Sequence, residues 1–186
     1  MSNQEPVYDN SFPIRKYQII YADPPWEFNF RNRKGLSTTA RNNLYNTMKD
    51  EDIKCLPIHT IADSDCALFL WIMNSKLPLA LDCIKQWGFA YKTVAFSWVK
   101  TTKNTFHFGG GNWTRSNVEL CLLATKGRLK RKSASVRNLV VSPLRRHSQK
   151  PDEIRDAIVA LVGDLPRIEL FARQKFTGWD CWGDQV

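Results

Sequence analysis

The sequence predicts an α/β fold in which one mainly parallel β-sheet lies between two layers of helices. Two observations predict it. Apolar runs such as CALFLWIM (66–73) and VELCLLATKG (118–127) are continuous, as expected of strands that are buried on both faces. Segments with helical spacing separate several of these runs. A length of 186 residues with 43% hydrophobic residues suits one domain with an ordinary core.

The expected elements alternate along the chain. Strands are expected at 17–22, 66–73, 90–100, 118–127, 138–142 and 167–172, and helices at 48–56, 76–87 and 151–162. The last helix has the clearest pattern, because Ile154, Ile158 and Leu161 share one face and Gly163 follows the final turn. Two polar segments, 27–47 and 101–116, are longer than ordinary connections, and loops of that length usually carry function.

We expect the whole chain, 1–186, to form a single domain, with residues 1–16 as a loosely structured N-terminal extension. No apolar run approaches the roughly 18 residues needed to span a membrane, and the N-terminus lacks the features of a secretory signal. The five cysteines form no CxxC pair, and the three histidines show no metal-ligand spacing. We therefore predict reduced thiols, no metal, no membrane association and an intracellular location.

Positive charge is in excess and clustered. Lys and Arg number 27 against 18 Asp and Glu, which gives a net charge of +9. Much of the excess lies in RNRK (31–34), KGRLKRK (126–132) and RRHSQK (145–150). Solubility alone is the simpler explanation, but clustering favours a polyanionic partner, because cations that neutralise phosphates release counterions. We expect nucleic-acid contacts from the basic residues Arg31, Arg33, Lys34, Arg41 and Arg115, and also from the cluster at 130–132.

A candidate site follows from the residues that come directly after the strands. In parallel α/β sheets, ligands bind beyond the carboxyl ends of the strands. DPPW (23–26) follows the first strand, and the loop at 101–116, TKG (125–127) and the residues after LFA (170–172) follow other strands. We expect these four segments to converge on one site.

Asp23 carries the most specific chemistry in this set. Proline is rare inside a sheet and an unpaired carboxylate at its edge is costly, so a purely structural reason for DPPW is hard to find. The carboxylate of Asp23 and the carbonyl of Pro24 can accept both N–H bonds of an exocyclic amine on a nucleobase. This would localise the nitrogen lone pair for attack on a methyl sulfonium, with Trp26 stacked on the base. The alternative is an Asp-Pro turn beside a core tryptophan.

Eight blocks of the sequence resemble one family of enzymes. They are YADPPW (21–26), LYNTM (44–48), ALFLWIMNS (67–75), FSWVKT (96–101), ELCLLATKG (119–127), HSQKPDEI (147–154), IELFAR (168–173) and GWDCWGDQ (178–185). In this order they resemble the mRNA N6-adenosine methyltransferase (MT-A type) family, and especially its short bacterial and phage relatives that methylate adenine in DNA. The resemblance implies a Rossmann-like fold with a permuted motif order, which uses S-adenosylmethionine and releases S-adenosylhomocysteine. The permuted order explains why no GxGxxG follows a strand, and we interpret GGG at 109–111 as a flexible substrate loop.

The resemblance also implies roles for single residues. The catalytic motif is Asp23, Pro24, Pro25 and Trp26, and the aromatic residues near the target base are Tyr45 and Trp98. The implied cofactor contacts are Asp23, Lys126, Arg173, Lys175, Asp184 and Gln185. Asp184 stands where the family has an asparagine, and an aspartate also accepts hydrogen bonds from ribose hydroxyls.

Three functions are consistent with these features. The first is methylation of adenine in DNA, which the compact catalytic domain favours, in the cytoplasm of a bacterial or phage-infected cell. The second is the same reaction on RNA, which differs mainly through contacts to the 2′-hydroxyl. The third is a non-catalytic nucleic-acid-binding partner subunit, although such members of the family usually lack DPPW. A homodimer or an association with a partner subunit fits any of them.

Overall fold

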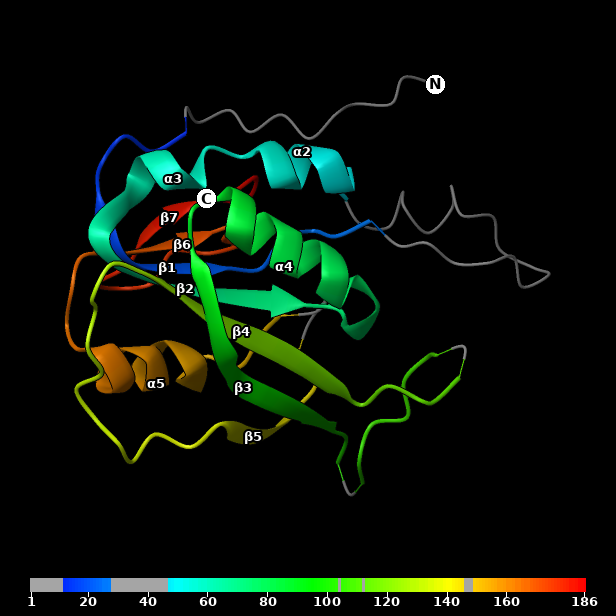
Figure 1. Ribbon diagram of the computed structural model, residues 1–186. Helices are drawn as coiled ribbons and strands as arrows, with labels where there is room; N and C mark the ends of the chain where they lie inside the picture. The colour runs from blue at the N-terminus through cyan, green and yellow to red at the C-terminus, as the bar shows by residue number, and fades with distance from the viewer. Residues whose placement is uncertain (1–11, 28–46, 104, 112, 146–148) are drawn as a thin grey trace.

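The computed structural model describes residues 12–27, 47–103, 105–111, 113–145 and 149–186. Within them, seven strands form one sheet in the spatial order β5-β3-β4-β2-β1-β6-β7 (Figure 1). The strands are β1 (Tyr17–Ala22), β2 (Ala62–Ile72), β3 (Ala90–Thr101), β4 (Val118–Lys126), β5 (Leu139–Pro143), β6 (Arg167–Leu170) and β7 (Asp180–Trp182).

Helices cover both faces of the sheet, so the predicted three-layer α/β arrangement is confirmed (Figure 1). One face carries α2 (Asp50–Cys55), α3 (Ile58–Ile61) and α4 (Leu77–Gln86), and the other carries α5 (Glu153–Val162). A short 3-10 turn at Asn74–Lys76 precedes α4. In this part of the chain no helix is both long enough and apolar enough to cross a membrane.

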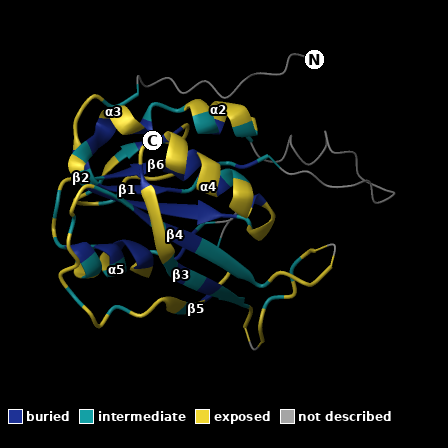
Figure 2. Cartoon of the chain, in the orientation of Figure 1, coloured by how far each residue is buried: buried dark blue, intermediate teal, exposed yellow. Residues whose placement is uncertain are grey.

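The continuous apolar strands are explained by two hydrophobic clusters, one on each face. Figure 2 shows the central strands of the sheet in the dark blue of buried residues. Successive side chains of a strand point to opposite faces. In β1, Ile20 and Ala22 therefore join the cluster that contains α2–α4, whereas Ile19 and Tyr21 join the cluster that contains α5. Because both faces of the strand are removed from water, its sequence is apolar throughout and does not alternate between apolar and polar residues.

One strand runs against all the others. Strands β2, β1, β6 and β7 pair in parallel, and β3 pairs in parallel with β5. Strand β4 is antiparallel to both of its neighbours, β2 and β3. It therefore begins at the edge where the other strands end. As a consequence TKG (125–127) lies at the opposite edge, and the expectation that it joins the other segments at one site is wrong.

The boundaries of the elements agree closely with the sequence prediction. The differences are β2, which begins at Ala62, and two short elements, α3 and β7, which were not expected. Four and three residues are too few for a periodic pattern to appear. Helix α4 and helix α5 end next to Gly88 and Gly163, whose φ angles of 81° and 102° suit glycine.

Candidate active site

Asp23 lies where β1 ends, at the edge that also receives the ends of β2 and β6. Its side chain is 25% exposed, so the carboxylate is mostly removed from water but still accessible. Lys150 donates hydrogen bonds to both oxygens of this carboxylate, at 2.7 Å each. The lysine side chain is only 7% exposed, and it reaches Asp23 from a position 127 residues further along the chain.

A second carboxylate shares the same lysine. Glu119 occupies the second position of β4, and its Oε2 lies 3.3 Å from the Lys150 Nζ. Glu119 also forms an ion pair with Lys100, near the end of β3. Because β4 is antiparallel, its first residues reach the edge where Asp23 lies, two strands away or about 10 Å. The result is a continuous chain of contacts, Lys100–Glu119–Lys150–Asp23.

The electrostatics of these four side chains keep the cation of Lys150 beside the carboxylates of Asp23 and Glu119. Burial raises the pKa of Asp23, and the positive charge of Lys150 opposes that rise. Burial by itself would lower the pKa of Lys150, but Asp23 and Glu119 outweigh it and the pKa is raised. Burial would likewise raise the pKa of Glu119, but Lys150 and Lys100 hold it below its ordinary value. Lys150 therefore stays protonated and Glu119 stays ionised.

The rest of DPPW is held by the core and by the segment before α2. The indole N–H of Trp26 donates to the carbonyl oxygen of Trp71 at 3.0 Å, and Trp26 is only 4% exposed. The expectation that Trp26 stacks on a base is therefore wrong, because this ring is packed in the core. The Pro25 carbonyl accepts the N–H of Met48 at 2.9 Å, and the Pro24 carbonyl accepts the N–H of Trp26 at 2.8 Å. A carbonyl oxygen has two lone pairs, so Pro24 can still accept one further donor.

A cavity beside Asp23 joins the ends of β1 and β6 to the segment after β7. It is lined by Asp23, Gln149, Lys150, Arg155, Glu169, Phe171, Arg173, Gln174 and Gln185. Three of the residues predicted to bind a cofactor, Asp23, Arg173 and Gln185, thus come together here. Asp184 is exposed but does not line this cavity.

The segments after β6 and β7 are pressed together, and this brings Arg173 close to Gln185. The N–H of Ala172 donates to the carbonyl oxygen of Trp182 at 3.0 Å. A Cβ at Gly183 would lie 2.2 Å from the Ala172 oxygen, so only glycine allows this approach. Phe171 just before it has a φ of 62°, a conformation that is rare for a bulky residue. The backbone here is constrained in a way that favours a binding role.

Arg155 fixes the inner wall of the same cavity. This residue of α5 makes two hydrogen bonds of 2.7 Å to the two carboxylate oxygens of Glu169 on β6. Its guanidinium also lies 3.4 Å from the centre of the Phe176 ring, in the segment that follows Arg173. A buried bidentate pair of this kind is geometrically specific, so it ties α5, β6 and the 173–176 segment together.

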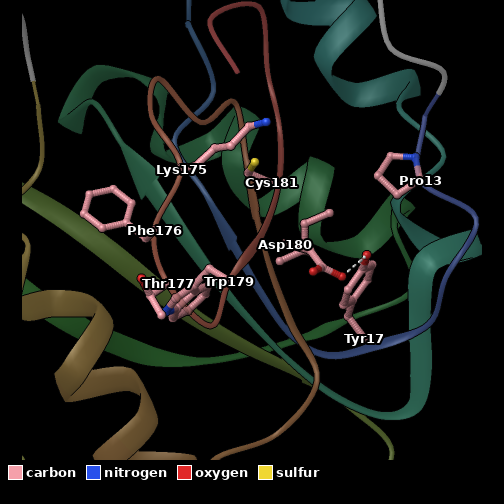
Figure 3. A pocket seen from close by; sticks show the side chains of 9 residues that line it. Pro13, Tyr17, Lys175, Phe176, Thr177, Trp179, Asp180 and Cys181 are labelled. Carbon is pink, nitrogen blue, oxygen red and sulfur yellow. Dashed lines mark hydrogen bonds between the residues drawn. The ribbon is translucent and has the colours of Figure 1, made fainter.

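Two predicted cofactor residues lie elsewhere. Lys126 is the last residue of β4, so it lies at the end of the sheet that is far from Asp23, where it pairs with Cys66 of β2. Its Nζ lies 3.4 Å from the carbonyl oxygen of Ala62. Lys175 lines a second, separate cavity with Tyr17 and Asp180, which form a hydrogen bond of 2.8 Å (Figure 3). Neither lysine lines the cavity beside Asp23.

The predicted substrate residues have mixed positions. Trp98 is fully buried and donates to the Ser142 carbonyl at 3.0 Å, so the expectation that it touches a base is wrong. Arg115 is exposed in the loop between β3 and β4. The remaining predicted contacts lie outside the described residues: Arg31, Arg33, Lys34, Arg41 and Tyr45.

Lys150 and Glu119 were not assigned a role from the sequence. Both lie in blocks that carry the family resemblance, HSQKPDEI and ELCLLATKG. A signal for Glu119 was present, since a carboxylate next to a continuous apolar run needs a partner. The partner was not predictable, because it depends on the direction of β4.

Comparison with known proteins identifies the family. The sequence model of the MT-A70 family matches residues 17–185, from the first residue of β1 to Gln185 in the cavity. The chain belongs to the MT-A70 family. This confirms the resemblance seen in the sequence blocks, and the sheet described above is the Rossmann-like methyltransferase fold. Membership in the MT-A70 family makes the chain a methyltransferase, and supports methyl transfer to the N6 amine of adenine from S-adenosylmethionine.

The MT-A70 relatives of this chain include a protein of similar length and proteins that are several times longer. The type II methyltransferase M.MunI of Mycoplasma sp is 35% identical over 190 residues, which cover 94% of this chain and 79% of that protein. The MT-A70-like N(6)-adenosine-methyltransferase of Drosophila melanogaster and the catalytic subunit METTL3 of Homo sapiens are each 30% identical over 93% of this chain. The aligned regions make up only 27% and 29% of those two proteins.

Proposed function

We propose that this chain methylates the N6 amine of adenine in DNA, with Asp23 as the residue that orients and activates the amine. The observation that carries the proposal is the position of the Asp23 carboxylate, which lines the cavity together with Arg173 and Gln185. An acceptor for the amine and groups suited to the methyl donor therefore share one space.

The residues of the cavity fit S-adenosylmethionine by their chemistry. The guanidinium of Arg173 suits the carboxylate of the donor, and the carboxylate of Asp23 suits its ammonium group. The side-chain amide of Gln185 can hydrogen-bond a ribose hydroxyl. When bound, S-adenosylmethionine supplies a methyl group on a positively charged sulfur.

Asp23 and the Pro24 carbonyl are proposed to accept the two N–H bonds of the adenine amine. Two such hydrogen bonds draw the nitrogen toward tetrahedral geometry and localise its lone pair. With S-adenosylmethionine bound, the N–C bond would form as the S–C bond breaks, and the bonding electrons would remain on sulfur. The amine loses its extra proton to Asp23 or to water. This is catalysis by positioning and electrostatic stabilisation, without a covalent enzyme intermediate.

Lys150 is proposed to hold the Asp23 carboxylate in place and in its ionised form. An ionised carboxylate offers about four lone-pair positions. Lys150 occupies one on each oxygen, so further N–H donors can still be accepted. The positive charge of Lys150 also opposes the increase in the pKa of Asp23 that burial causes. Both effects favour the acceptor form of Asp23 near neutral pH.

DNA is favoured over RNA by the alignment with M.MunI, which covers most of both proteins. The net charge of +9 supports binding to either nucleic acid. RNA is the second candidate, because relatives named N(6)-adenosine-methyltransferase align over 93% of the chain. Those relatives are much longer than this chain, so their names are weaker support for its substrate.

Incubation with isotope-labelled S-adenosylmethionine and matched DNA and RNA oligonucleotides tests the proposal. Nucleoside mass spectrometry then measures the product. We expect labelled N6-methyl-deoxyadenosine from DNA, and with Asp23→Asn a rate of labelling that is lower by about 10²–10³-fold. Label confined to RNA would move the chain to the second candidate. Label in neither, with nucleic-acid binding intact, would assign it to the non-catalytic partners.

A further inference from the structure

The loop between β3 and β4, residues 102–117, carries three large exposed aromatic side chains among its described residues, which are all but 104 and 112. We name it the aromatic finger. Trp113 is 99% exposed, Phe108 is 76% exposed and Phe106 is 60% exposed. The guanidinium of Arg115 lies 5.2 Å from the centre of the Phe108 ring. Large exposed apolar side chains that gather in one segment usually mark an interaction site.

Backbone hydrogen bonds and close backbone contacts stabilise the aromatic finger. At its base, the backbone N–H of His107 donates to the Lys100 carbonyl at 2.8 Å, and the backbone N–H of Lys100 donates to the Asn117 carbonyl at 2.8 Å. Further out, a Cβ on Gly109 would lie 1.9 Å from the Ser116 oxygen, and a Cβ on Gly111 would lie 1.9 Å from the Thr114 oxygen. The two halves of the loop therefore approach so closely that only glycine fits at both positions. The glycines allow this close approach, and the interpretation of GGG as a flexible substrate loop stays a prediction.

The finger starts at the chain of contacts that ends on Asp23. Lys100 precedes it and Glu119 follows it, and both belong to the chain Lys100–Glu119–Lys150–Asp23. Figure 1 shows the finger projecting from the same end of the sheet at which β1 finishes. Trp113 is four residues from Asn117, so it can project about 13 Å beyond the strands, which exceeds the depth of a DNA major groove of about 8.5 Å.

We propose that the aromatic finger is a wedge for duplex DNA, and that Trp113 enters the base stack beside the target adenine. This inference rests on the proposed function. An adenine amine inside a duplex cannot reach the Asp23 carboxylate, so the base has to leave the stack. In proteins that bind the minor groove, apolar side chains inserted between base steps partly unstack the bases and kink the duplex.

Charge favours DNA over a second protein chain as the occupant. The segment 102–117 contains Lys103, His107 and Arg115 but neither aspartate nor glutamate. Cations next to stacking aromatic rings match a nucleic acid, in which phosphates lie beside flat bases. A second copy of this chain also carries net positive charge and would be repelled.

Trp113→Ala is the first test, because a side chain exposed to this extent contributes nothing to the core. The substrates are a duplex and its matched single strand, both with the sequence methylated in the assay above. On the duplex we expect at least a ten-fold loss of single-turnover rate, whereas the single strand keeps its rate because no base needs to be extruded. With 2-aminopurine at the target position, the fluorescence increase on binding is lost.

Two control variants accompany this test. Trp113→Phe should keep most of the duplex rate and of the fluorescence increase. Tyr91→Ala is the matched control, because it removes an exposed aromatic residue at the other end of β3, and it should change neither the rate nor the fluorescence.

A second pair of variants leaves every aromatic side chain in place. Gly111→Ala forces the finger to reshape, because its Cβ would meet the Thr114 oxygen. Gly110→Ala is the matched control, since a Cβ there meets nothing within 4 Å. We expect the duplex-specific loss with Gly111→Ala and unchanged rates with Gly110→Ala.

The outcomes separate the wedge from the proposed function. If the wild-type protein methylates DNA and Trp113→Ala lowers both rates equally, or neither, the wedge is wrong and the proposed function stands. An equal loss that accompanies a dimer becoming a monomer in light scattering would make the finger an interface between copies. If the wild-type protein methylates no DNA, the proposed function fails first.

Discussion

Both ends of the sheet carry positive charge, but they place it in different surroundings. Where β1 and β6 finish, the side chains of Lys100 and Lys150 are only 16% and 7% exposed, and each contacts a carboxylate. At the other end, the cluster 130–132 is exposed. The backbone N–H of Lys132 there donates to the Leu161 carbonyl, in the last turn of α5, where positive charge favours the helix dipole.

The difference teaches that clustering in the sequence does not locate a catalytic site. Exposed charges are screened and contribute little to one another, whereas a buried charge needs a specific partner. The three consecutive basic residues at 130–132 are conspicuous in the sequence, yet they lie away from Asp23. Lys150 is only the last residue of the basic segment RRHSQK (145–150), yet it is buried and contacts the one carboxylate on which the proposed reaction depends.

The largest expected difference between the two ends is in turnover. Asp23→Asn removes the charge that polarises the amine, so we expect the rate to fall by about 10²–10³-fold. Lys126→Ala, at the opposite end, should leave the rate within about two-fold, because Lys126 does not line the cavity beside Asp23 and its hydrogen bond is to the Ala62 carbonyl. Single-turnover methyl transfer measures both, and circular dichroism checks that each variant is folded. Equal losses in the two variants would contradict the assignment of the site.

A smaller difference is expected in binding of S-adenosylmethionine. Arg173 lines the cavity and Lys175 does not, although only one residue separates them. Loss of a charge-assisted hydrogen bond predicts about ten- to hundred-fold weaker binding for Arg173→Ala. Lys175→Ala serves as the matched control and should bind normally. Isothermal titration calorimetry gives both dissociation constants, and a stronger effect at Lys175 would reverse the assignment.

The pH dependence of activity tests the link between Lys150 and Asp23. The proposed reaction needs ionised Asp23, whose pKa is raised by burial and lowered by the charge of Lys150. In Lys150→Met the lowering is lost, so the pKa rises further and the acidic limb of kcat/KM moves to higher pH. Lys150→Arg keeps the charge and should move the limb less. An acidic limb that stays at the wild-type position in Lys150→Met would show that the lysine does not tune Asp23.

The same variant should also change the pH dependence of stability. A folded-state pKa above the unfolded value favours the folded protein at low pH and disfavours it once the group ionises. The melting temperature of Lys150→Met should therefore fall furthest below wild type at neutral pH, and the deficit should shrink as the pH approaches and passes below the ordinary pKa of aspartate. A deficit independent of pH would indicate lost packing.

The smallest expected effect is on the salt dependence of DNA binding. Each cation that neutralises a phosphate contributes about 0.9 to the slope of log K against log salt. Replacement of Lys103 and Arg115 in the aromatic finger by Gln should flatten the slope by up to about two such contributions. The sequence alone predicted nucleic-acid contacts from the cluster 130–132, but its place at the far end of the sheet now predicts that its neutralisation changes the slope little. Filter binding at several salt concentrations distinguishes the two positions.

The sequence alone was enough to predict most of the fold and part of the site. Hydrophobic runs report burial, and six of the strands and the three longest helices were found in this way. Asp23 was singled out because it directly follows such a run, whereas Arg173 was assigned through the family resemblance of the block IELFAR. Trp26 and Trp98 were misassigned, because an aromatic residue beside a site and one packed in the core look identical in a sequence.

By itself, the sequence determined the layers of the fold, the position of DPPW after a buried strand and membership in the MT-A70 family. Only the tertiary structure decided that β4 runs backwards, which moves Lys126 away and brings Glu119 in. It alone also decided that Lys150 meets Asp23. The physical reason is that a hydrophobic pattern reads the same in either strand direction. A contact across 127 residues depends on the path of the whole chain, which no local pattern records.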